Sequence, residues 1–482
     1  MPSIVSTNHP DYTKKADKWR RCRDVVAGAD AVKAAGVRYL PALKDQSTDE
    51  YNAYKDRAKW FGATWRTIEA LKGMIFRKPP QVEAAESIKP FLDDVTLTGK
   101  SLMVFAHQVV LDVLTTGRVG VLVDYPQHST EGLTLADAQA LNLRPTLAMY
   151  PTESITNWKT ERIGNATVLS LLVLTEDAAL DGNEFEHNTE TRYRVLDLAA
   201  IAGDDGSARR VYRVRVFRVK DGEDEQIGAD LFPLMNGSPL SAIPFFFLGV
   251  DDTTPDVDDP PLIDLCDLNL DHYRLSADHK HGLHFTGLPT AWIAGYTKQE
   301  EGEKLYLGSS HAWIFPDPQA KAGFLEFTGV GLSSISDEMA CDKEEMATIG
   351  ARLLTAEKKA TETAQAARIY RAGESSILAA IAGTISDGLT KALRVFSEWA
   401  GVKDDSVKVE LNRDFMPPEV TPEELAGILQ SWQAGLPGFS DQGVFDMLQR
   451  KEVIAVGVTL EEEQARIGEK RPPAPDGTGE GV

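Results

Sequence analysis

One block of the chain, residues 145–250, most constrains the fold because it consists almost entirely of strand-like segments. Short runs rich in Val, Leu, Tyr and Phe are separated by turn-like clusters such as LDGNE, GDDGS and DGEDE, which is typical of β structure. The expected strands are TLAMYP, TVLSLLVL, RYRVLDL, RVYRVRVFRVK and IPFFFLGV. Helical patterns precede and follow this block, so the sequence predicts a mixed α+β fold.

The segment RVYRVRVFRVK indicates a half-buried antiparallel strand. Val214 and Val216 alternate with Arg213 and Arg215, so the arginines are expected on the solvent-facing side. A row of phosphate-binding arginines is the alternative interpretation, although paired surface strands commonly carry such rows.

The segment TTGRVGVLVDYP, residues 115–126, resembles a glycine-rich phosphate loop at first sight. A phosphate loop needs the order strand, loop, helix, because the anion binds the N-H groups at a helix N-terminus. Here a helix over about 101–116 comes first, Gly117 is suited to be its left-handed cap, and the strand VGVLVDY follows. The segment is therefore interpreted as a turn between a helix and a strand.

Further helices are predicted from apolar residues spaced three and four apart. The first, over 48–75, has a stripe of Tyr and Trp side chains and ends at RKPP, because proline cannot continue a helix. The others are expected at about 262–284, 334–354, 374–401, 421–434 and 440–450. Three β segments, LPTAWIAG, KLYLGSSHAWIFP and GFLEFTG, are expected between the helices at 262–284 and 334–354.

The segment GVDDTTPDVDDPPL, residues 249–262, is expected to be a linker because it holds five aspartates and three prolines. The helix after it contains a histidine cluster formed by His272, His279, His281 and His284. Two of these residues are only two positions apart and cannot share a helix face, and no H-E-x-x-H motif occurs. We therefore expect surface or interface histidines and no metal site.

The composition excludes several classes of protein. Acidic residues outnumber basic ones 73 to 51, which gives a formal charge of −22 and disfavours tight binding of nucleic acid over the whole surface. The cysteines Cys22, Cys266 and Cys341 are too far apart for a metal motif, and a disulfide framework is not expected. The N-terminus lacks the apolar segment of a secretion signal, and no apolar run is long enough to span a membrane.

Familiar catalytic patterns are also missing from the sequence. It contains no G-x-S-x-G, no Walker or dinucleotide motif, and no metal-ligand spacing. No enzyme activity and no cofactor are expected, and the balance shifts towards a structural or assembly protein. Catalytic carboxylates leave no spacing signature, so a hydrolase that uses acidic residues around 251–271 stays open as an alternative.

The order of several segments resembles the portal, or head-to-tail connector, proteins of tailed bacteriophages, and more narrowly a branch long catalogued only as a domain of unknown function. The resembling stretches cover most of residues 30–415. They are VKAAGVRYLP, YNAYKDRAKW, TWRTIEALKGMIFRKPP, TTGRVGVLVDYP, PLIDLCDLNLDHYRLSADHKHGLHFTGLPTAWIAG, GARLLTAEKKATETAQAARIYRAGESSILAAIAGTI and VELNRDF.

The resemblance implies a dodecameric ring around a DNA channel, in which each subunit has a wing, a two-helix stem, a clip and a helical crown. The implied parts are a wing at 1–258, stem helices at 259–284 and 334–354, a clip at 285–333, a tunnel loop at 355–366, a return helix and wing at 367–415, a crown-like helical segment at 416–465, and a disordered tail at 466–482.

The same resemblance suggests functional residues. Lys358 and Lys359 in the tunnel loop would face the DNA, and Trp292, Trp313 and Phe315 in the clip would contact partner proteins. The implied partners are further copies of the chain, double-stranded DNA bound without sequence specificity, terminase, a major capsid or scaffolding protein and a head-tail adaptor, with no membrane. The protein would be assembled in the host cytoplasm and reside at the portal vertex of the virion. A different head-tail adaptor or minor capsid protein is the second alternative.

Overall fold

The computed structural model describes residues 4–126, 142–180, 185–202, 208–287, 290–295, 313–315, 317–325, 329–352, 377–415, 421–436, 438–451, 453–454 and 458–470. The chain divides into two compact units, Met1–Arg413 and Asp414–Val482, and each is described by itself. Both helices and sheets occur, and no sheet of the described residues closes into a barrel, which agrees with the predicted α+β class.

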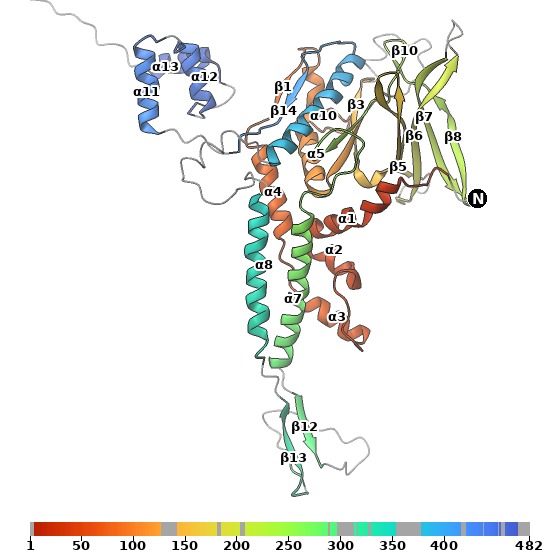
Figure 1. The fold of residues 1–482 in the computed structure, drawn as a ribbon, viewed down its shortest axis with the longest axis vertical. Coiled ribbons are helices and arrows are strands. Elements are labelled where there is room, and N and C mark those ends of the chain that lie inside the picture. The colour runs from red at the N-terminus through yellow and green to blue at the C-terminus, as the bar shows by residue number, and fades with distance from the viewer. Residues whose placement is uncertain are drawn as a thin grey trace, which may run out of the picture. The chain divides into compact units, whose positions relative to one another are not determined.

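The first unit contains two sheets that share one core (Figure 1). The larger is antiparallel in the order β4-β5-β6-β7-β8, with strands at Ile155–Ile163, Ala166–Ala179, Thr189–Ala202, Ala208–Lys220 and Glu223–Leu231. The smaller has the order β11-β2-β3, with strands at Phe245–Gly249, Arg118–Asp124 and Thr146–Pro151. Side chains from both sheets, including Trp158, Tyr212 and Phe245, form one buried cluster, so the two sheets stabilise each other.

Helices complete this part of the first unit. Helix α5, Leu102–Thr116, packs on β2, and helix α10, Ile377–Trp399, packs on β11 and β2. Two short strands, β1 at Gln81–Glu83 and β14 at Lys408–Glu410, pair beside α10. Helix α10 returns the chain to this region from far along the sequence, so the segments between β11 and α10 form an insertion into the sheet region.

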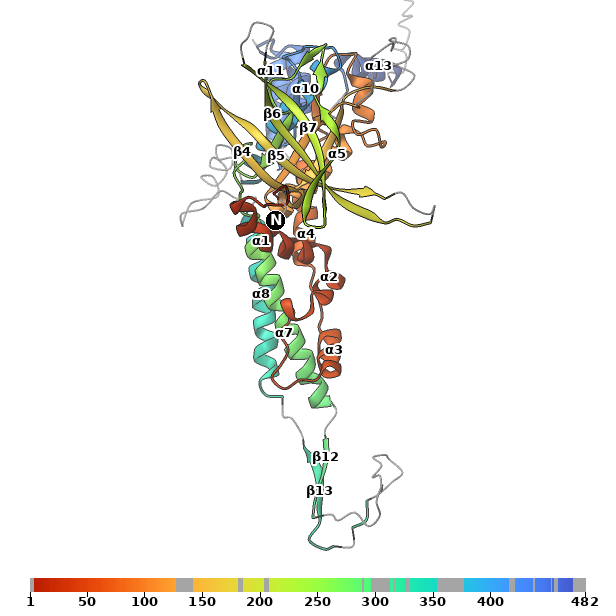
Figure 2. The same ribbon diagram turned by 90° about the vertical axis from the view of Figure 1, so that its right-hand side faces the viewer.

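That insertion contains two long helices, α7 at Ile263–Gly287 and α8 at Leu332–Arg352 (Figure 2). The helices begin and end within a few residues of the predicted 262–284 and 334–354. They pack antiparallel, and between them lies the hairpin formed by β12, Thr290–Ala294, and β13, Lys321–Leu325. We call α7 and α8 the stem and this hairpin the clip hairpin.

The N-terminal helices lie along α7 (Figures 1 and 2). They are α1 at Pro10–Ala27, α2 at Ala29–Ala34, α3 at Thr48–Arg57 and α4 at Ala63–Ile75. A buried cluster that includes Cys22, Tyr54, Cys266 and Tyr273 joins α1 and α3 to α7. The stem is therefore covered on this side by residues that the sequence analysis placed in the wing.

The prediction of one helix over 48–75 is wrong, because the chain leaves the helical path between α3 and α4. The break frees backbone groups that a helix would pair internally, and Asn269 of α7 binds them instead. Its side chain accepts from the Thr64 N-H at 3.2 Å and donates to the Phe61 carbonyl at 2.7 Å. A buried amide that satisfies both groups makes the interruption stable.

The turn interpretation of TTGRVG is confirmed. Ser101 caps α5 at its N-terminus, and Gly117 ends the helix in the left-handed region with φ of 86°. The glycine also allows a close approach, because a Cβ there would lie 2.8 Å from the carbonyl oxygen of Asp259.

We expect Gly117→Ala to lower the free energy of unfolding by more than backbone strain alone explains. The matched control is Gly401→Ala, at a position that also has φ of 86° and where an added methyl group would meet no atom within 4 Å. The control should cost about 1–2 kcal/mol for the left-handed backbone. Gly117→Ala should cost at least about 1 kcal/mol more because of the clash. Equal losses in urea unfolding would contradict this interpretation of the turn.

The second unit is helical. It contains α11 at Pro422–Gln433, α12 at Asp441–Arg450 and α13 at Leu460–Lys470, and Ile428, Val444 and Phe445 are buried. The first two helices are as predicted, whereas α13 extends into the predicted disordered tail at 466–482 as far as Lys470. Among the described residues, no helix is long and apolar enough to cross a membrane.

Candidate functional site

The packing of the stem follows from one stripe on α8. Leu332, Ile335, Met339, Met346 and Ile349 recur at helical spacing and are the partly or fully buried apolar positions of that helix. At the far end Gly282 of α7 lets Leu332 approach, since a Cβ there would lie 2.5 Å from Leu332 Cδ2. Helix α8 thus packs by one face, against α7 and, near Gly350, against α4, and most of its other residues are exposed.

The histidine cluster divides into a buried and a partly exposed part. His272 is 2% exposed, lies beside the Phe61 ring at 5.5 Å, and has no hydrogen-bond partner for either ring nitrogen among the described residues. Burial, together with the nearby Lys343, lowers the pKa of His272 to about 4, so this side chain is neutral in the stem.

The other histidines lie further along α7. His281 packs edge-on against the Tyr54 and Phe285 rings, and His284 is 3.2 Å from an Arg57 nitrogen. In the part of the chain that the structure describes, no group of three His, Cys, Asp or Glu side chains could hold a metal ion. His272, His281 and His284 contact neighbouring side chains of the same chain and are packing residues here.

The clip hairpin exposes apolar side chains. In its register Trp292 pairs with Gly323, and the indole lies over that glycine, 3.2 Å from where a Cβ would be. Trp292 is nevertheless 42% exposed, and Phe324 and Leu325 are exposed more fully. A two-stranded hairpin is marginally stable alone, so this one is suited to binding another surface.

The other predicted site residues have different outcomes. Trp313 and Phe315 are half-buried and lie outside the strands, so the strand expected over KLYLGSSHAWIFP is not present at its end. Lys358 and Lys359, and the whole tunnel loop at 355–366, lie outside the described residues.

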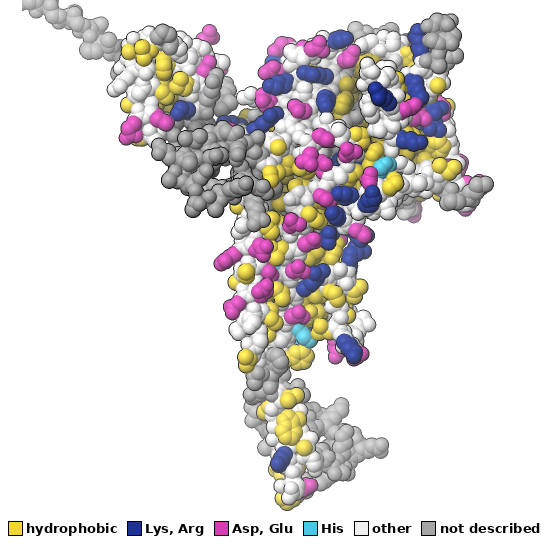
Figure 3. All heavy atoms as spheres, in the orientation of Figure 1, with side chains coloured by type: hydrophobic (Ala, Val, Ile, Leu, Met, Phe, Trp, Pro, Cys, Tyr) yellow, Lys and Arg dark blue, Asp and Glu magenta, His cyan; other side chains and the backbone are white. Residues whose placement is uncertain are grey.

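Carboxylates gather on the exposed part of α8, and Figure 3 shows them along that helix. Glu338, Glu344 and Glu345 are exposed, as is Asp337, whereas Asp342 is 7% exposed. Burial raises the pKa of Asp342, and the negative charges of Glu338, Asp271 and Glu345 raise this pKa further. This crowding of like charges is a local cost in the isolated chain, and Asp342 occupies a position of the α8 stripe, between Met339 and Met346, where an apolar residue would be expected.

The arginines of strand β7 bind carboxylates of the sheet itself. Arg213 donates to Asp197 through Nε and Nη2 at 3.0 and 2.7 Å, and Arg215 donates to the same carboxylate at 2.6 Å. The strand prediction is confirmed, and the charge of these two arginines is compensated across β6 and β7.

Sequence reasoning missed Arg118, which follows the Gly117 turn and is fully buried. Its guanidinium lies 4.4 Å from the Trp158 ring centroid and 5.3 Å from that of Phe247, and Nη1 donates to the Pro255 carbonyl at 2.9 Å. Burial lowers the pKa of Arg118 to about 10. The side chain ties β2 to the Asp-rich linker, which is a structural role.

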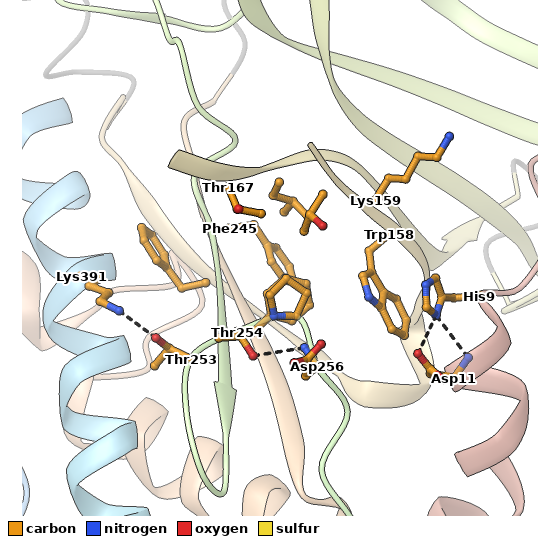
Figure 4. Close-up of a pocket in the computed structure, with 15 residues that line it drawn as sticks. His9, Asp11, Trp158, Lys159, Thr167, Phe245, Thr253, Thr254, Asp256 and Lys391 are labelled. Carbon is orange, nitrogen blue, oxygen red and sulfur yellow. Dashed lines mark hydrogen bonds and ion pairs between the residues drawn. The ribbon is translucent and has the colours of Figure 1, made fainter. Parts of the chain in front are cut away.

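A pocket of about 620 Å³ lies in front of Trp158 (Figure 4). The His9 ring stacks on Trp158 at 4.0 Å, and its Nδ1 accepts from the Asp11 N-H at 3.2 Å. On the other side, Lys391 donates to Thr253 Oγ1 at 2.7 Å. These polar groups form hydrogen bonds to other residues that line the pocket. We assign no catalytic or binding role to this pocket.

Two of the aspartates at 251–271, the range that the hydrolase alternative would use, form structural contacts. Asp258 accepts from the backbone N-H groups of Val250 and Asp251 at 2.8 and 3.2 Å. Asp259 lies 2.7 Å from both Lys15 and Lys18 of α1. The linker is thereby fixed to α1.

Comparisons with known proteins give a partial family match and distant structural likenesses. A family described as a domain of unknown function, DUF4055, matches residues 261–400, which include both stem helices and α10. No curated protein sequence matches the chain.

Among solved structures, the chain is similar to one from the neck of an empty GTA particle computed with C6 symmetry, at 13% identity and a TM-score of 0.35, covering 90% of this chain and 96% of that one. It is similar to a chain in the virion of a native gene transfer agent particle, at 12% identity and a TM-score of 0.35, and the match covers 92% of this chain and 99% of that one. A third similar chain, from the neck of a native GTA particle computed with C12 symmetry, has 12% identity and a TM-score of 0.36, and the match covers 80% of this chain and 89% of that one.

Proposed function

We propose that the chain is a portal protein, a subunit of a closed ring at one vertex of a phage-like head. Double-stranded DNA would pass through the ring during packaging and ejection, and the clip hairpin would bind terminase and later a head-tail adaptor. The proposal assigns the protein no catalytic activity and no cofactor.

The observation that carries the proposal is the stem with its hairpin. Two long helices are inserted between β11 and α10, α8 is covered on one face only, and the hairpin between them exposes aromatic and aliphatic side chains. Surfaces of this kind are found where a subunit binds further protein. The segments that resemble portal proteins in sequence include the whole of α7 and the end of α8 from Gly350, which makes a portal ring the assembly that we favour.

The charge of the chain supports a role in DNA transit. A net charge of −22 lowers the affinity for phosphate, so a duplex could slide past the subunits without being held. Local contacts through Lys358 and Lys359 belong to the proposal as well. Because phosphate contacts carry no sequence information, such contacts would be non-specific.

The test is the assembly state of the purified full-length chain, measured by sedimentation velocity and negative-stain electron microscopy over several salt concentrations and in a crowding agent. We expect closed rings with a central channel, of one size class. Monomers and small dimers under all conditions would contradict the proposal. Linear or two-fold assemblies would favour another virion component, such as an adaptor or minor capsid protein.

A further inference from the structure

One side of α8 carries three carboxylate side chains that have no cation to pair with among the residues that the structure describes. Glu338, Asp342 and Glu345 lie at i, i+4 and i+7 and form the acidic strip, in which Glu338 and Glu345 border the stripe that faces α7 and the buried Asp342 lies within that stripe. Glu338 and Glu345 are exposed, and no Lys or Arg of the described residues lies within ion-pair distance of them. Asp342 is 7% exposed, and its Oδ2 is buried without a hydrogen-bond partner in the described part of the chain.

On the other side of α8, Lys343 of that helix and Arg66 of α4 are cations without a paired carboxylate among the described residues. Lys343 lies with its Nζ 5.2 Å from the centroid of the Phe61 ring, and the Arg66 guanidinium lies 5.3 Å from the same centroid. Both cations are exposed, and neither forms an ion pair with a described carboxylate. We call Phe61, Arg66 and Lys343 the cation patch.

The two surfaces lie on different sides of the stem. Lys343 is directed to the segment between α3 and α4, as its contact with Phe61 shows, whereas Asp342 interacts electrostatically with Asp271 of α7. On the helix the exposed Glu338 and Glu345 lie on one flank of the stripe that faces α7, and the series 336, 340, 343 and 347 lies on the other.

The two surfaces also lie at one level of the stem. Lys343 follows Asp342 directly, so they differ by about 1.5 Å along the helix axis. Copies in a closed ring are related by rotation, which preserves height along the ring axis. When that axis is close to parallel to the stem, different surfaces at equal height on neighbouring copies meet, which is a heterologous contact.

We propose that the acidic strip of one copy binds the cation patch of the next copy around the ring. The inference rests on the proposed ring and names the surfaces that close it. A second copy satisfies both surfaces at once, because it brings cations to the uncompensated carboxylates and carboxylates to the uncompensated cations. Nucleic acid would be attracted by the cation patch and repelled by the acidic strip on the other side of the stem.

Reversing the charges of each surface in turn tests whether the acidic strip and the cation patch of neighbouring copies contact each other. Glu338→Lys with Glu345→Lys makes both surfaces cationic, and Arg66→Glu with Lys343→Glu makes both anionic. Either double variant alone is expected to raise the concentration needed for ring assembly by at least about 100-fold, because like charges then face each other. The matched control reverses Asp337 and Glu344 to lysine, which keeps the charge change but lies on the face of α8 turned away from α7.

Mixing gives the decisive result. The two double variants in equal amounts should restore rings, since each cationic surface then meets an anionic one in alternating copies. Rings that form from either variant alone as well as from the wild type would overturn the inference, as would failure of the mixture while both variants melt like the wild type. Absence of rings from the wild-type chain would instead overturn the proposed function.

Cys341 supplies a second, independent readout. It lies on α8 between Glu338 and Glu345 at helical spacing and is exposed, whereas Cys22 and Cys266 are buried. Assembly should slow the reaction of Cys341 with a thiol reagent by at least about tenfold, because the neighbouring copy covers it. The slowing should disappear in either double variant, and an unchanged rate in intact wild-type rings would contradict the inference.

Discussion

Replacing Arg23 by alanine is expected to lower the free energy of unfolding by about 3–5 kcal/mol, because it removes the cation from two partly buried carboxylates. From α1, Arg23 donates to Asp112 of α5 through Nη1 and Nη2 at 2.5 and 3.0 Å. Its Nε and Nη2 also donate to Glu153 at 2.8 and 3.0 Å. Asp112 is only 6% exposed, so water cannot replace the lost guanidinium.

The loss should depend on pH. Burial raises the pKa of Asp112 above its ordinary value even with Arg23 present. The folded state therefore binds the proton more tightly than the unfolded state, and this group's contribution to stability falls as pH rises through that window. Without Arg23 the pKa of Asp112 should rise further, so the deficit should be largest near pH 8 and shrink towards about pH 5.

The control is Arg20→Ala on the same helix. Arg20 pairs with Asp17, whose side chain is 84% exposed, and surface pairs of this kind contribute only about 0–1 kcal/mol. Urea unfolding of both variants at the two pH values measures the difference. A loss in Arg23→Ala as small as in Arg20→Ala, or a deficit that does not change with pH, would show that the buried cluster contributes little.

The elements that sequence periodicity predicted are those whose pattern and caps lie close together in the chain. Helix α5 has its apolar positions, its Ser101 cap and its Gly117 terminus within one continuous segment, so local chemistry determines it. The stem helices were predicted within three residues at each end for the same reason. Strands β5, β6, β7 and β11 alternate or are continuously apolar, which also makes them visible.

The missed features depend on partners far along the chain or on weak patterns. The break before α4 is stabilised by Asn269, more than 200 residues away, and no local signal reveals it. Strand β8 is exposed along almost its whole length, so it shows no alternation and resembles a turn region. Arg118 is buried between rings of β4 and β11, which only the fold brings together.

In the candidate site, too, some features follow from the local sequence and others depend on contacts between distant segments. The sequence placed Trp292 between two helices, but its exposure on a hairpin with Gly323 beneath the indole depends on the pairing of β12 with β13. The acidic strip lies wholly on α8 and the cation patch partly on it, yet the surroundings of both surfaces include Phe61 and Asp271 on other segments. Composition alone indicated an acidic chain and did not show where the charge is uncompensated.

Removing the clip hairpin is expected to abolish DNA packaging while leaving rings intact. The variant joins Gly287 to Gly329 by a short Gly-Ser linker. The helix ends can be joined in this way because a Cβ on Gly329 would lie 3.4 Å from Thr286 Oγ1. The α8 stripe, the acidic strip and the cation patch are all retained, so the ring contact should survive. Terminase would lose the exposed apolar surface that the proposed function assigns to it.

Two measurements distinguish a role of the hairpin in ring assembly from a role in DNA packaging. Electron microscopy reports the rings, and nuclease-protected DNA in particles reports packaging. A single change, Trp292→Ser, should lower packaging in the same direction because an exposed aromatic is removed from the centre of the hairpin. Met103→Ser, which removes a similarly exposed apolar side chain from α5, is the control and should package normally. Packaging at the wild-type level without the hairpin would refute its docking role, and loss of rings would show instead that neighbouring hairpins hold the ring together.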